Sequence, residues 1–232
     1  MGVMKQLLKN FIKQIIFHYR KILLSKKKIY LMSGVKISKK TFFESNIKIH
    51  PSTSIQNSKI GKGTYVGTKS KYDNCEIGRF CSIAPFSGVI YGSHPTSKYV
   101  TTHPAFFSTL KQAGFSFVKE NKFRENRFLD EEKKVSVKIG NDVWIGEGVK
   151  ILEGCSIGDG AIIGANSLVT KNIDPFTINI GQPTKVLKYR FNKEQVEFLL
   201  NFKWWDKEIE WIELNRALFE NIEVFMKSHK TE

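Results

Sequence analysis

Two histidines lie in an irregular stretch, GSHPTSKYVTTHPAFF, which runs from Gly92 to Phe107. His94 and His103 are two of the five histidines in the chain. Histidine changes its charge near neutral pH, so it can take a proton from a substrate and return it to a leaving group. Because functional residues are often carried by loops, this stretch is the first candidate for chemistry. The alternative is that each ring only packs or hydrogen-bonds within its loop.

Other kinds of chemistry have less support in the sequence. The three cysteines form no CxxC pair, and an odd number suits neither a disulfide framework nor a zinc site. The other three histidines have no partner at catalytic or metal-ligand spacing, so no metal is expected. No GxxxxGK[ST] or GxGxxG element follows a predicted strand, which argues against ATP or dinucleotide chemistry.

The elements that must position these histidines follow a six-residue rhythm. From residue 139 an aliphatic side chain returns at every sixth position: Ile139, Ile145, Ile151, Ile157, Ile163 and Val169. Four residues after the first five of these come Val143, Val149, Cys155, Ala161 and Ser167. A period of six fits neither a helix nor a simple strand. It fits a coil with three flat faces, in which the aliphatic residue points inward and stacked coils bury a continuous core. We therefore predict an all-β solenoid of hexapeptide repeats.

The rhythm is interrupted once at length. It appears less regularly in residues 49–89, stops after Val89, and resumes at Ile139. A gap of about fifty residues is far longer than an ordinary connection and suggests a functional or disordered segment. We predict an excursion loop over 90–137 within a β-helix domain over 45–190. Apolar residues at helical spacing then predict a helical extension over 191–232.

Residues 137–191, VKIGNDVWIGEGVKILEGCSIGDGAIIGANSLVTKNIDPFTINIGQPTKVLKYRF, resemble the hexapeptide-repeat acyltransferases, whose fold is a left-handed parallel β-helix. The chain is most similar to their xenobiotic acetyltransferase branch, in which a histidine-bearing loop leaves the helix and a Trp-Trp pair follows the last coil. Here these are GSHP and Trp204–Trp205, and the resemblance covers roughly residues 45–215. It implies a homotrimer that binds acetyl-CoA along the C-terminal coils, in a cleft between adjacent prisms. The handedness comes from the resemblance alone.

The resemblance also implies roles for single residues. His94 stands where the branch carries its catalytic histidine, so it is expected to be the general base. His103 and Trp144 are expected to form walls of the acceptor site, although both side chains could also serve only in packing.

The expected acetyl-CoA site is assigned to small residues and to cations near the last coils. Small residues let a pantetheine arm approach the backbone, but hexapeptide corners favour small residues in any case. Cations would meet the phosphates of the co-substrate, although a solvated surface charge is the alternative for each. The residues are Gly146, Ala165, Thr170, Lys171, Lys185 and Arg190.

Positive charge is concentrated in the first forty residues. They hold 11 of the lysines and arginines and no acidic residue, in a chain of formal net charge +15. Apolar residues at helical spacing predict an amphipathic helix over 1–30. Lys9 and Lys13 interrupt its apolar run, so neither a membrane span nor a signal peptide is expected, and the protein is expected in the cytoplasm. The helix either lies on the inner face of the anionic membrane or packs on the body or on a neighbouring subunit.

These features favour an acetyl-CoA-dependent O-acetyltransferase that acts on a sugar hydroxyl in cell-surface polysaccharide synthesis, with no nucleic acid partner. Alternatives are N-acetylation of a nucleotide-linked amino sugar and O-acetylation of a drug. A minor alternative is a non-catalytic solenoid that binds membrane or nucleic acid. The acceptor is not identified, because similar folds host many substrates. Lys122, Arg124 and Arg127 in the excursion could meet an acidic sugar or simply face water.

Overall fold

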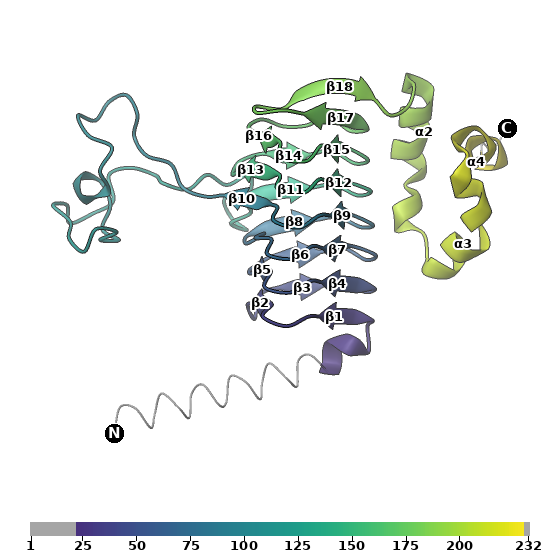
Figure 1. The fold of residues 1–232 in the computed structure, drawn as a ribbon, viewed down its shortest axis with the longest axis horizontal. Coiled ribbons are helices and arrows are strands. Elements are labelled where there is room, and N and C mark those ends of the chain that lie inside the picture. The colour runs from purple at the N-terminus through teal and green to yellow at the C-terminus, as the bar shows by residue number, and fades with distance from the viewer. Residues whose placement is uncertain (1–21, 230–232) are drawn as a thin grey trace.

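The computed structural model describes residues 22–229, which form a three-sided parallel β-helix and a helical tail (Figure 1). The coils pass in turn through three flat faces, here called A, B and C. The predicted parallel solenoid is confirmed, and it is consistent with the left-handed β-helix implied by the resemblance. Most of the helix predicted over 1–30 lies outside the described residues.

Face A is an eight-stranded sheet, parallel except for the antiparallel strand that closes it at the C-terminal end. Its first strand begins at Ile29, so the coils start before residue 45, where the sequence pattern places the boundary. The strands are β1 (Ile29–Leu31), β4 (Ile47–Ile49), β7 (Tyr65–Val66), β9 (Ser82–Ile83), β12 (Trp144–Ile145), β15 (Ile162–Ile163), β17 (Thr177–Ile180) and β18 (Lys185–Tyr189).

Faces B and C complete each coil. Face B contains β2 (Lys36–Ile37), β5 (Ser54–Ile55), β10 (Gly88–Ile90), β13 (Lys150–Leu152) and β16 (Leu168–Val169), and Lys71 bridges β5 to β10. Face C contains β3 (Phe42–Phe43), β6 (Lys59–Ile60), β8 (Cys75–Ile77), β11 (Val137–Ile139) and β14 (Ser156–Ile157). Because β10 belongs to face B and β11 to face C, the excursion leaves the prism at the corner between these faces.

The repeated inward positions build the core. Five aliphatic residues stack in register on face A, and each is 0% exposed: Ile49, Val66, Ile83, Ile145 and Ile163. Full burial of such a side chain contributes about 1.5–3 kcal/mol, so repetition itself stabilises the prism. The cysteines are free and buried in the same core. Burial raises the pKa of the Cys81 thiol to about 12, which makes it a packing residue and a poor nucleophile.

The excursion, residues 91–136, projects away from the prism as an ordered unit (Figure 1, left). Backbone hydrogen bonds join its distant parts: the N–H of Lys122 donates to the carbonyl of Phe107 at 2.8 Å, and the N–H of Phe117 donates to that of Ala105 at 2.8 Å. It also contains a short 3-10 helix, Pro104–Phe106. The predicted loop is therefore folded on itself, with a conformation that can hold side chains in fixed positions.

The helical tail lies on the other side of the prism from the excursion (Figure 1). Asn192 starts it with a capping box, in which Asn192 and Gln195 each accept the other's backbone N–H. Trp205 is buried, and Trp204 packs against Phe80 of the prism with ring centroids 4.9 Å apart. The elements are α2 (Lys193–Phe202), a 3-10 turn (Trp204–Asp206), α3 (Ile209–Leu214), a 3-10 turn (Arg216–Glu220) and α4 (Ile222–His229).

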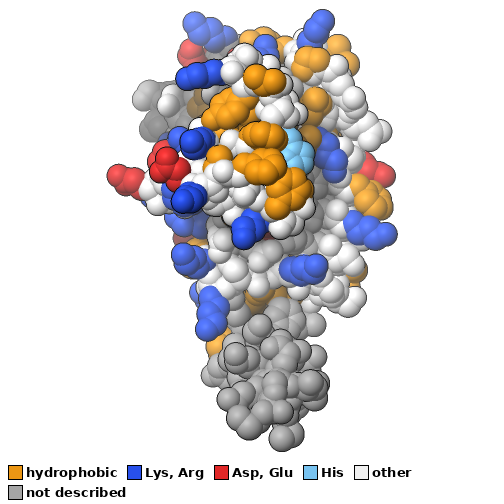
Figure 2. All heavy atoms as spheres, turned by 90° about the vertical axis from the view of Figure 1, so that its left-hand side faces the viewer, with side chains coloured by type: hydrophobic (Ala, Val, Ile, Leu, Met, Phe, Trp, Pro, Cys, Tyr) orange, Lys and Arg blue, Asp and Glu red, His pale blue; other side chains and the backbone are white. Residues whose placement is uncertain are grey.

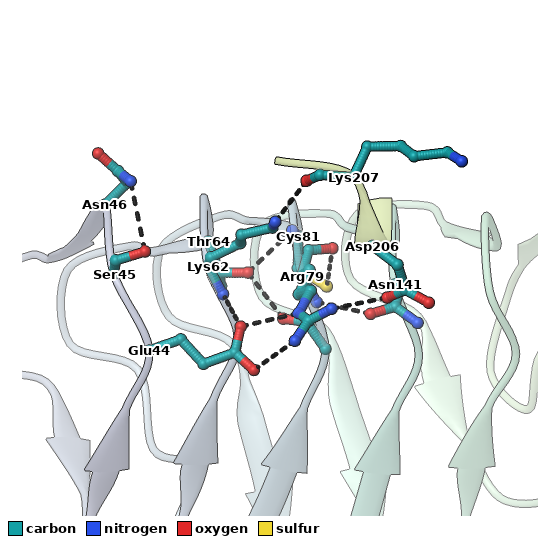
Figure 3. A network of polar contacts seen from close by, with 11 residues as sticks. Glu44, Ser45, Asn46, Lys62, Thr64, Arg79, Cys81, Asn141, Asp206 and Lys207 are labelled. Atoms are coloured by element: carbon teal, nitrogen blue, oxygen red, sulfur yellow. Dashed lines mark hydrogen bonds and ion pairs between the residues drawn. The ribbon is translucent and has the colours of Figure 1, made fainter. Parts of the chain in front are cut away.

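Arg79 joins the prism to this tail (Figure 3). Its Nε and Nη2 donate to the two carboxylate oxygens of Glu44 at 2.8 and 2.9 Å, and its Nη1 donates to Asp206 at 2.7 Å. Nearby, Lys62 Nζ donates to the carbonyl of Lys207. Charge-assisted bonds of this kind are stronger than neutral ones, so they help to fix the tail on the coils.

We expect the contribution of Glu44 to stability to depend on pH. The hydrogen bonds from Arg79 hold the pKa of the Glu44 carboxyl below its ordinary value of 4.5. A lowered folded-state pKa means that this contribution is complete above pH 4.5 and is lost as pH falls through the folded-state pKa. The Glu44→Gln variant should be less stable than wild type by about 1 kcal/mol at pH 7. In thermal unfolding, this gap should close as pH falls below 4.5.

A matched control for this experiment is Glu197→Gln. Glu197 is exposed, and its carboxylate makes only a long ion pair, 3.9 Å from Lys193 Nζ. This variant should change the melting temperature little at any pH. A gap between wild type and Glu44→Gln that stays constant into strong acid would contradict the assignment.

Candidate active site

His94 lies at the base of the excursion, soon after β10 ends at Ile90. Gly92 adopts a φ of +86°, a conformation that glycine reaches without strain, and it turns the chain away from the prism. The N–H of Ser93 donates to the carbonyl of Glu125 at 2.8 Å. The outgoing and returning segments are therefore tied together beside the histidine.

A hydrogen bond selects one tautomer of the neutral His94 ring. Its Nδ1 lies 2.6 Å from the carbonyl oxygen of Thr102. A carbonyl oxygen only accepts hydrogen bonds, so Nδ1 carries the hydrogen and donates it. In the neutral ring Nε2 then has the free lone pair, and the side chain is exposed. This arrangement presents a base to the surroundings, which is what deprotonation of a hydroxyl group requires.

Phe107 supports the same ring from behind. It is 0% exposed, and its ring is perpendicular to that of His94, with centroids 5.6 Å apart. Tyr99 and Phe123 complete the cluster, at 6.1 and 5.4 Å from Phe107. Edge-to-face packing of this kind is favourable beyond the area that it buries. The excursion therefore has a small core of its own, and His94 is one of its walls.

Glu153 is a buried carboxyl group under the base of the excursion. It follows β13, is 8% exposed, and accepts a hydrogen bond from the N–H of Gly92 at 3.2 Å. Burial raises the pKa of Glu153, an effect that the backbone N–H groups of Arg127 and Gly92 oppose. Gly92 lies on the outgoing segment, so its hydrogen bond to Glu153 ties this segment to face B. Glu153 is therefore a candidate positioning residue for the segment that carries His94.

For the acetyl transfer implied by the resemblance, we expect Glu153→Ala to lower kcat about tenfold with little change in the KM for acetyl-CoA, because the N–H of Gly92 loses its acceptor and the base of the excursion loosens. Glu153→Gln keeps an oxygen acceptor and should restore most of kcat. Steady-state kinetics of the two variants compares these outcomes. Equal losses in both would show that the charge, and not the hydrogen bond to Gly92, is required.

The neutral ring of His103 is held in the other tautomer from that of His94. Its Nδ1 accepts the backbone N–H of Ala105 at 3.2 Å, so the hydrogen of the neutral ring is on Nε2. The ring stacks on Phe115 with centroids 5.9 Å apart, beside Phe106 and Phe117. Figure 2 shows the hydrophobic patch and a histidine on this face of the molecule. His103 can donate a hydrogen bond from Nε2–H, which suits a wall residue better than a base.

Three of the residues assigned to binding lie on another part of the prism. Trp144 is on face A, between Ser82 and Ile162 of the neighbouring strands, and is 54% exposed. Gly146 and Ala165 are stacked at the corner between faces A and B, where a Cβ on Gly146 would lie 2.5 Å from the Ala165 nitrogen. The small size of Gly146 is therefore needed for coil stacking. The excursion that carries His94 leaves the prism at a different corner, between faces B and C. Within one chain, these three residues therefore do not lie beside His94.

Two further candidates share the corner of His94. Thr170 and Lys171 follow β16, which stacks on β13 and so lies on the same face as β10. Both side chains are exposed. Lys185 is exposed on β18 at the C-terminal end of face A. Exposed cations at the last coils remain available for the phosphates of acetyl-CoA.

Arg190 is occupied within the protein. Its Nη1 donates to Asp142 at 3.0 Å and to the carbonyl of Gly160 at 2.6 Å. The guanidinium also lies over the rings of Phe176 and Phe191. Burial raises the pKa of Asp142, and Arg190 opposes that effect. Arg190 holds the corner between faces C and A, away from both His94 and Thr170.

Sequence reasoning did not identify Thr102, Phe107 or Glu153. Only Glu153 carries a signal in the sequence: it follows Leu152, and Ile151 is the one aliphatic residue from Ile139 to Ile163 in the six-residue rhythm that glycine does not follow. In residues 22–229 no group of three His, Cys, Asp or Glu side chains could hold a metal ion. Within the same residues, every helix is too short or too polar to cross a membrane.

Comparison with known proteins agrees with this architecture. The family model described as bacterial transferase hexapeptide (six repeats) matches residues 136–171. A probable macrolide acetyltransferase from Lysinibacillus sphaericus is 37% identical over 154 residues, which is 66% of this chain and 77% of that protein. A chloramphenicol acetyltransferase from Klebsiella aerogenes is 36% identical over 141 residues, 60% of this chain and 62% of that protein.

Among solved structures, PerB from Caulobacter crescentus, in complex with CoA and GDP-perosamine, is 16% identical and has a TM-score of 0.47. The match covers 68% of this chain and 56% of that one. The family follows from the six-residue rhythm, the three-sided prism and the 37% identity to a relative that is matched over most of its length. The chain belongs to the hexapeptide-repeat transferases and, within them, to the acetyltransferases related to the chloramphenicol and macrolide enzymes.

Proposed function

We propose that this protein transfers an acetyl group from acetyl-CoA to a hydroxyl group of a sugar acceptor, with His94 as the general base. The observation that carries the proposal is the hydrogen bond from Nδ1 of His94, an exposed residue, to the carbonyl of Thr102, which leaves the lone pair of Nε2 to act as the base. Family membership supports the acetyl transfer, and it argues against the alternative of a non-catalytic solenoid.

The proposed reaction needs no acetylated side chain. Nε2 of His94 takes the hydroxyl proton as the acceptor oxygen attacks the thioester carbonyl carbon. The tetrahedral intermediate then collapses, the carbon–sulfur bond breaks, and the proton passes from Nε2 to the thiolate of CoA. The carbonyl of Thr102 faces the Nδ1–H throughout, so it stabilises the imidazolium that exists between the two proton transfers.

We further propose a homotrimer in which each site is shared between two copies. The separation of His94 from Trp144 and Ala165 in one chain supports this arrangement. A neighbouring prism would bring its own face A, with the co-substrate, to the excursion. Co-expression of His94→Ala with Ala165→Trp tests this directly: each variant alone should be inactive, and mixed trimers should regain activity. Mixed trimers without activity would contradict a shared site.

A second acceptor class has support of its own. The macrolide and chloramphenicol relatives favour O-acetylation of a drug. The deciding experiment supplies acetyl-CoA together with neutral sugars, acidic sugars, amino sugars, chloramphenicol and a macrolide, and identifies products by mass spectrometry. Alkaline hydroxylamine removes an acetyl ester and leaves an acetamide, so the same samples distinguish O-acetylation from N-acetylation. Acetylation of the drugs alone would overturn the sugar acceptor.

The cellular setting is proposed from the basic N-terminal segment. Its 11 lysines and arginines in residues 1–40 support contact with the inner face of the membrane, where lipid-linked precursors of surface polysaccharides are assembled. Flotation of the full chain with anionic liposomes, compared with a chain lacking residues 1–28, tests this contact. Equal flotation of the two chains would argue that the segment packs on the trimer.

A further inference from the structure

A pocket of about 380 Å³ opens beside His94. Its two walls are the outgoing segment, residues 93–99, and the returning segment, residues 122–127. The hydroxyl of Tyr99 donates to the carbonyl of Lys122 at 2.9 Å, and the N–H of Ser93 donates to the carbonyl of Glu125 at 2.8 Å. Phe123, which lies between Lys122 and Glu125 in the sequence, packs on Phe107. The two walls are therefore joined to each other, and Phe107 packs on both Phe123 and His94.

The charge of this pocket is of one sign. Lys98, Lys122 and Arg127 line it together with His94, and no aspartate or glutamate does. In the described part of the chain, none of these three cations is within 4.0 Å of a carboxylate. Arg127 attracts the buried Glu153 from a longer distance, but Glu153 does not line the pocket.

Three other cations of the excursion are paired. Arg124 and Lys134 contact Glu131, and Lys133 contacts Asp130 at 3.1 Å. Asp130 and Glu131 are thus paired with these cations, while Lys98, Lys122 and Arg127 leave unpaired positive charge beside His94. A concave surface lined by one sign of charge raises the local concentration of the opposite charge.

We infer that the acceptor carries an anionic group, which Lys98, Lys122 and Arg127 bind while the acceptor hydroxyl reaches Nε2 of His94. This inference rests on the proposed function and adds the chemical class of the acceptor. Carboxylates and phosphates share the relevant chemistry, because both accept charge-assisted hydrogen bonds from ammonium and guanidinium groups. The anion is either the carboxylate of an acidic sugar or the phosphate that links a sugar to its carrier.

The test uses acceptors with similar hydroxyl groups and different charges. Methyl glucoside is neutral, methyl glucuronide adds a carboxylate, and glucose 1-phosphate adds a phosphate. For the full-length protein we expect kcat/KM to be at least about tenfold higher for one charged acceptor than for methyl glucoside, and this advantage should shrink as salt is raised. The preferred charged acceptor identifies the source of the anion. Equal kcat/KM values for all three would overturn the inference.

The double variant Lys122→Met/Arg127→Met removes two of the cations and keeps much of the side-chain volume. It should raise the KM for the charged acceptor about tenfold or more, leave kcat within about twofold, and leave methyl glucoside unaffected. Lys133→Met is the matched control, since Lys133 is an exposed cation of the same excursion that pairs with Asp130. Equal losses for charged and neutral acceptors in the double variant would overturn the inference.

Titration calorimetry with the same compounds separates this inference from the proposed function. Binding of a charged acceptor that needs Lys122 and Arg127, without any acetyl transfer, would overturn the proposed reaction and support the anion site. Acetyl transfer to all sugars without preference for charge would support the reaction and overturn the anion site.

Discussion

Replacing His94 with alanine is expected to lower kcat for acetyl transfer by about 10²–10⁴-fold, with the affinity for acetyl-CoA unchanged. The alcohol is a weak nucleophile at neutral pH, and the variant has no group at this position to take its proton. The ring is also exposed and lies in the excursion, so its loss should not unfold the prism. Initial rates with saturating acetyl-CoA give kcat, and calorimetry with CoA gives the binding affinity.

Added imidazole provides a sharper readout for the same variant. If the defect is the missing base, imidazole should restore part of the activity of His94→Ala. It should have no effect on the activity of His50→Ala, which removes a histidine of the prism that lies against Tyr65. A fully active His94→Ala protein would remove His94 from the mechanism.

The fold could be predicted where one physical demand repeats. Each coil of the prism needs one inward aliphatic side chain in six, and this demand is visible without any knowledge of tertiary contacts. The same rhythm extends back through Leu31, Ile37 and Phe43, and these residues lie in β1, β2 and β3, the first strands of the prism. The coil that ends at Phe43 was missed because phenylalanine replaces the smaller aliphatic residue of the pattern. The predicted start at residue 45 therefore came too late.

The site could be predicted only in part, because the excursion has no repeat. Its position and the presence of His94 follow from the interruption of the rhythm. The carbonyl of Thr102, which orients the ring, is a backbone group, and any residue type could supply it. Likewise, the tautomers that distinguish His94 from His103 depend on which backbone group faces each Nδ1. Such contacts arise from the folded path of the loop and leave no mark on residue spacing.

Phe107 is the residue of the excursion whose truncation should have the largest effect on His94. Removing a buried phenylalanine side chain costs about 3–5 kcal/mol in a packed core, and this core is small. The ring of His94 and the rings of Tyr99 and Phe123 would lose their common contact. We expect Phe107→Ala to lower kcat by at least about tenfold with the KM for acetyl-CoA unchanged. Phe107→Leu, which retains most of the volume, should lie between this variant and wild type.

The prism should survive the change, because its core does not include Phe107. Phe107→Ala should therefore keep the main thermal transition, while a protease cuts it faster within residues 91–136. Leu110→Ala removes an apolar side chain of the same excursion that is 69% exposed, so it serves as the control and should resist the protease as wild type does. Unfolding of the whole chain at a lower temperature in Phe107→Ala would show that the excursion and the prism fold as one unit. In that case the loss of activity would follow from global stability, and the separate core of the excursion would not be what orients His94.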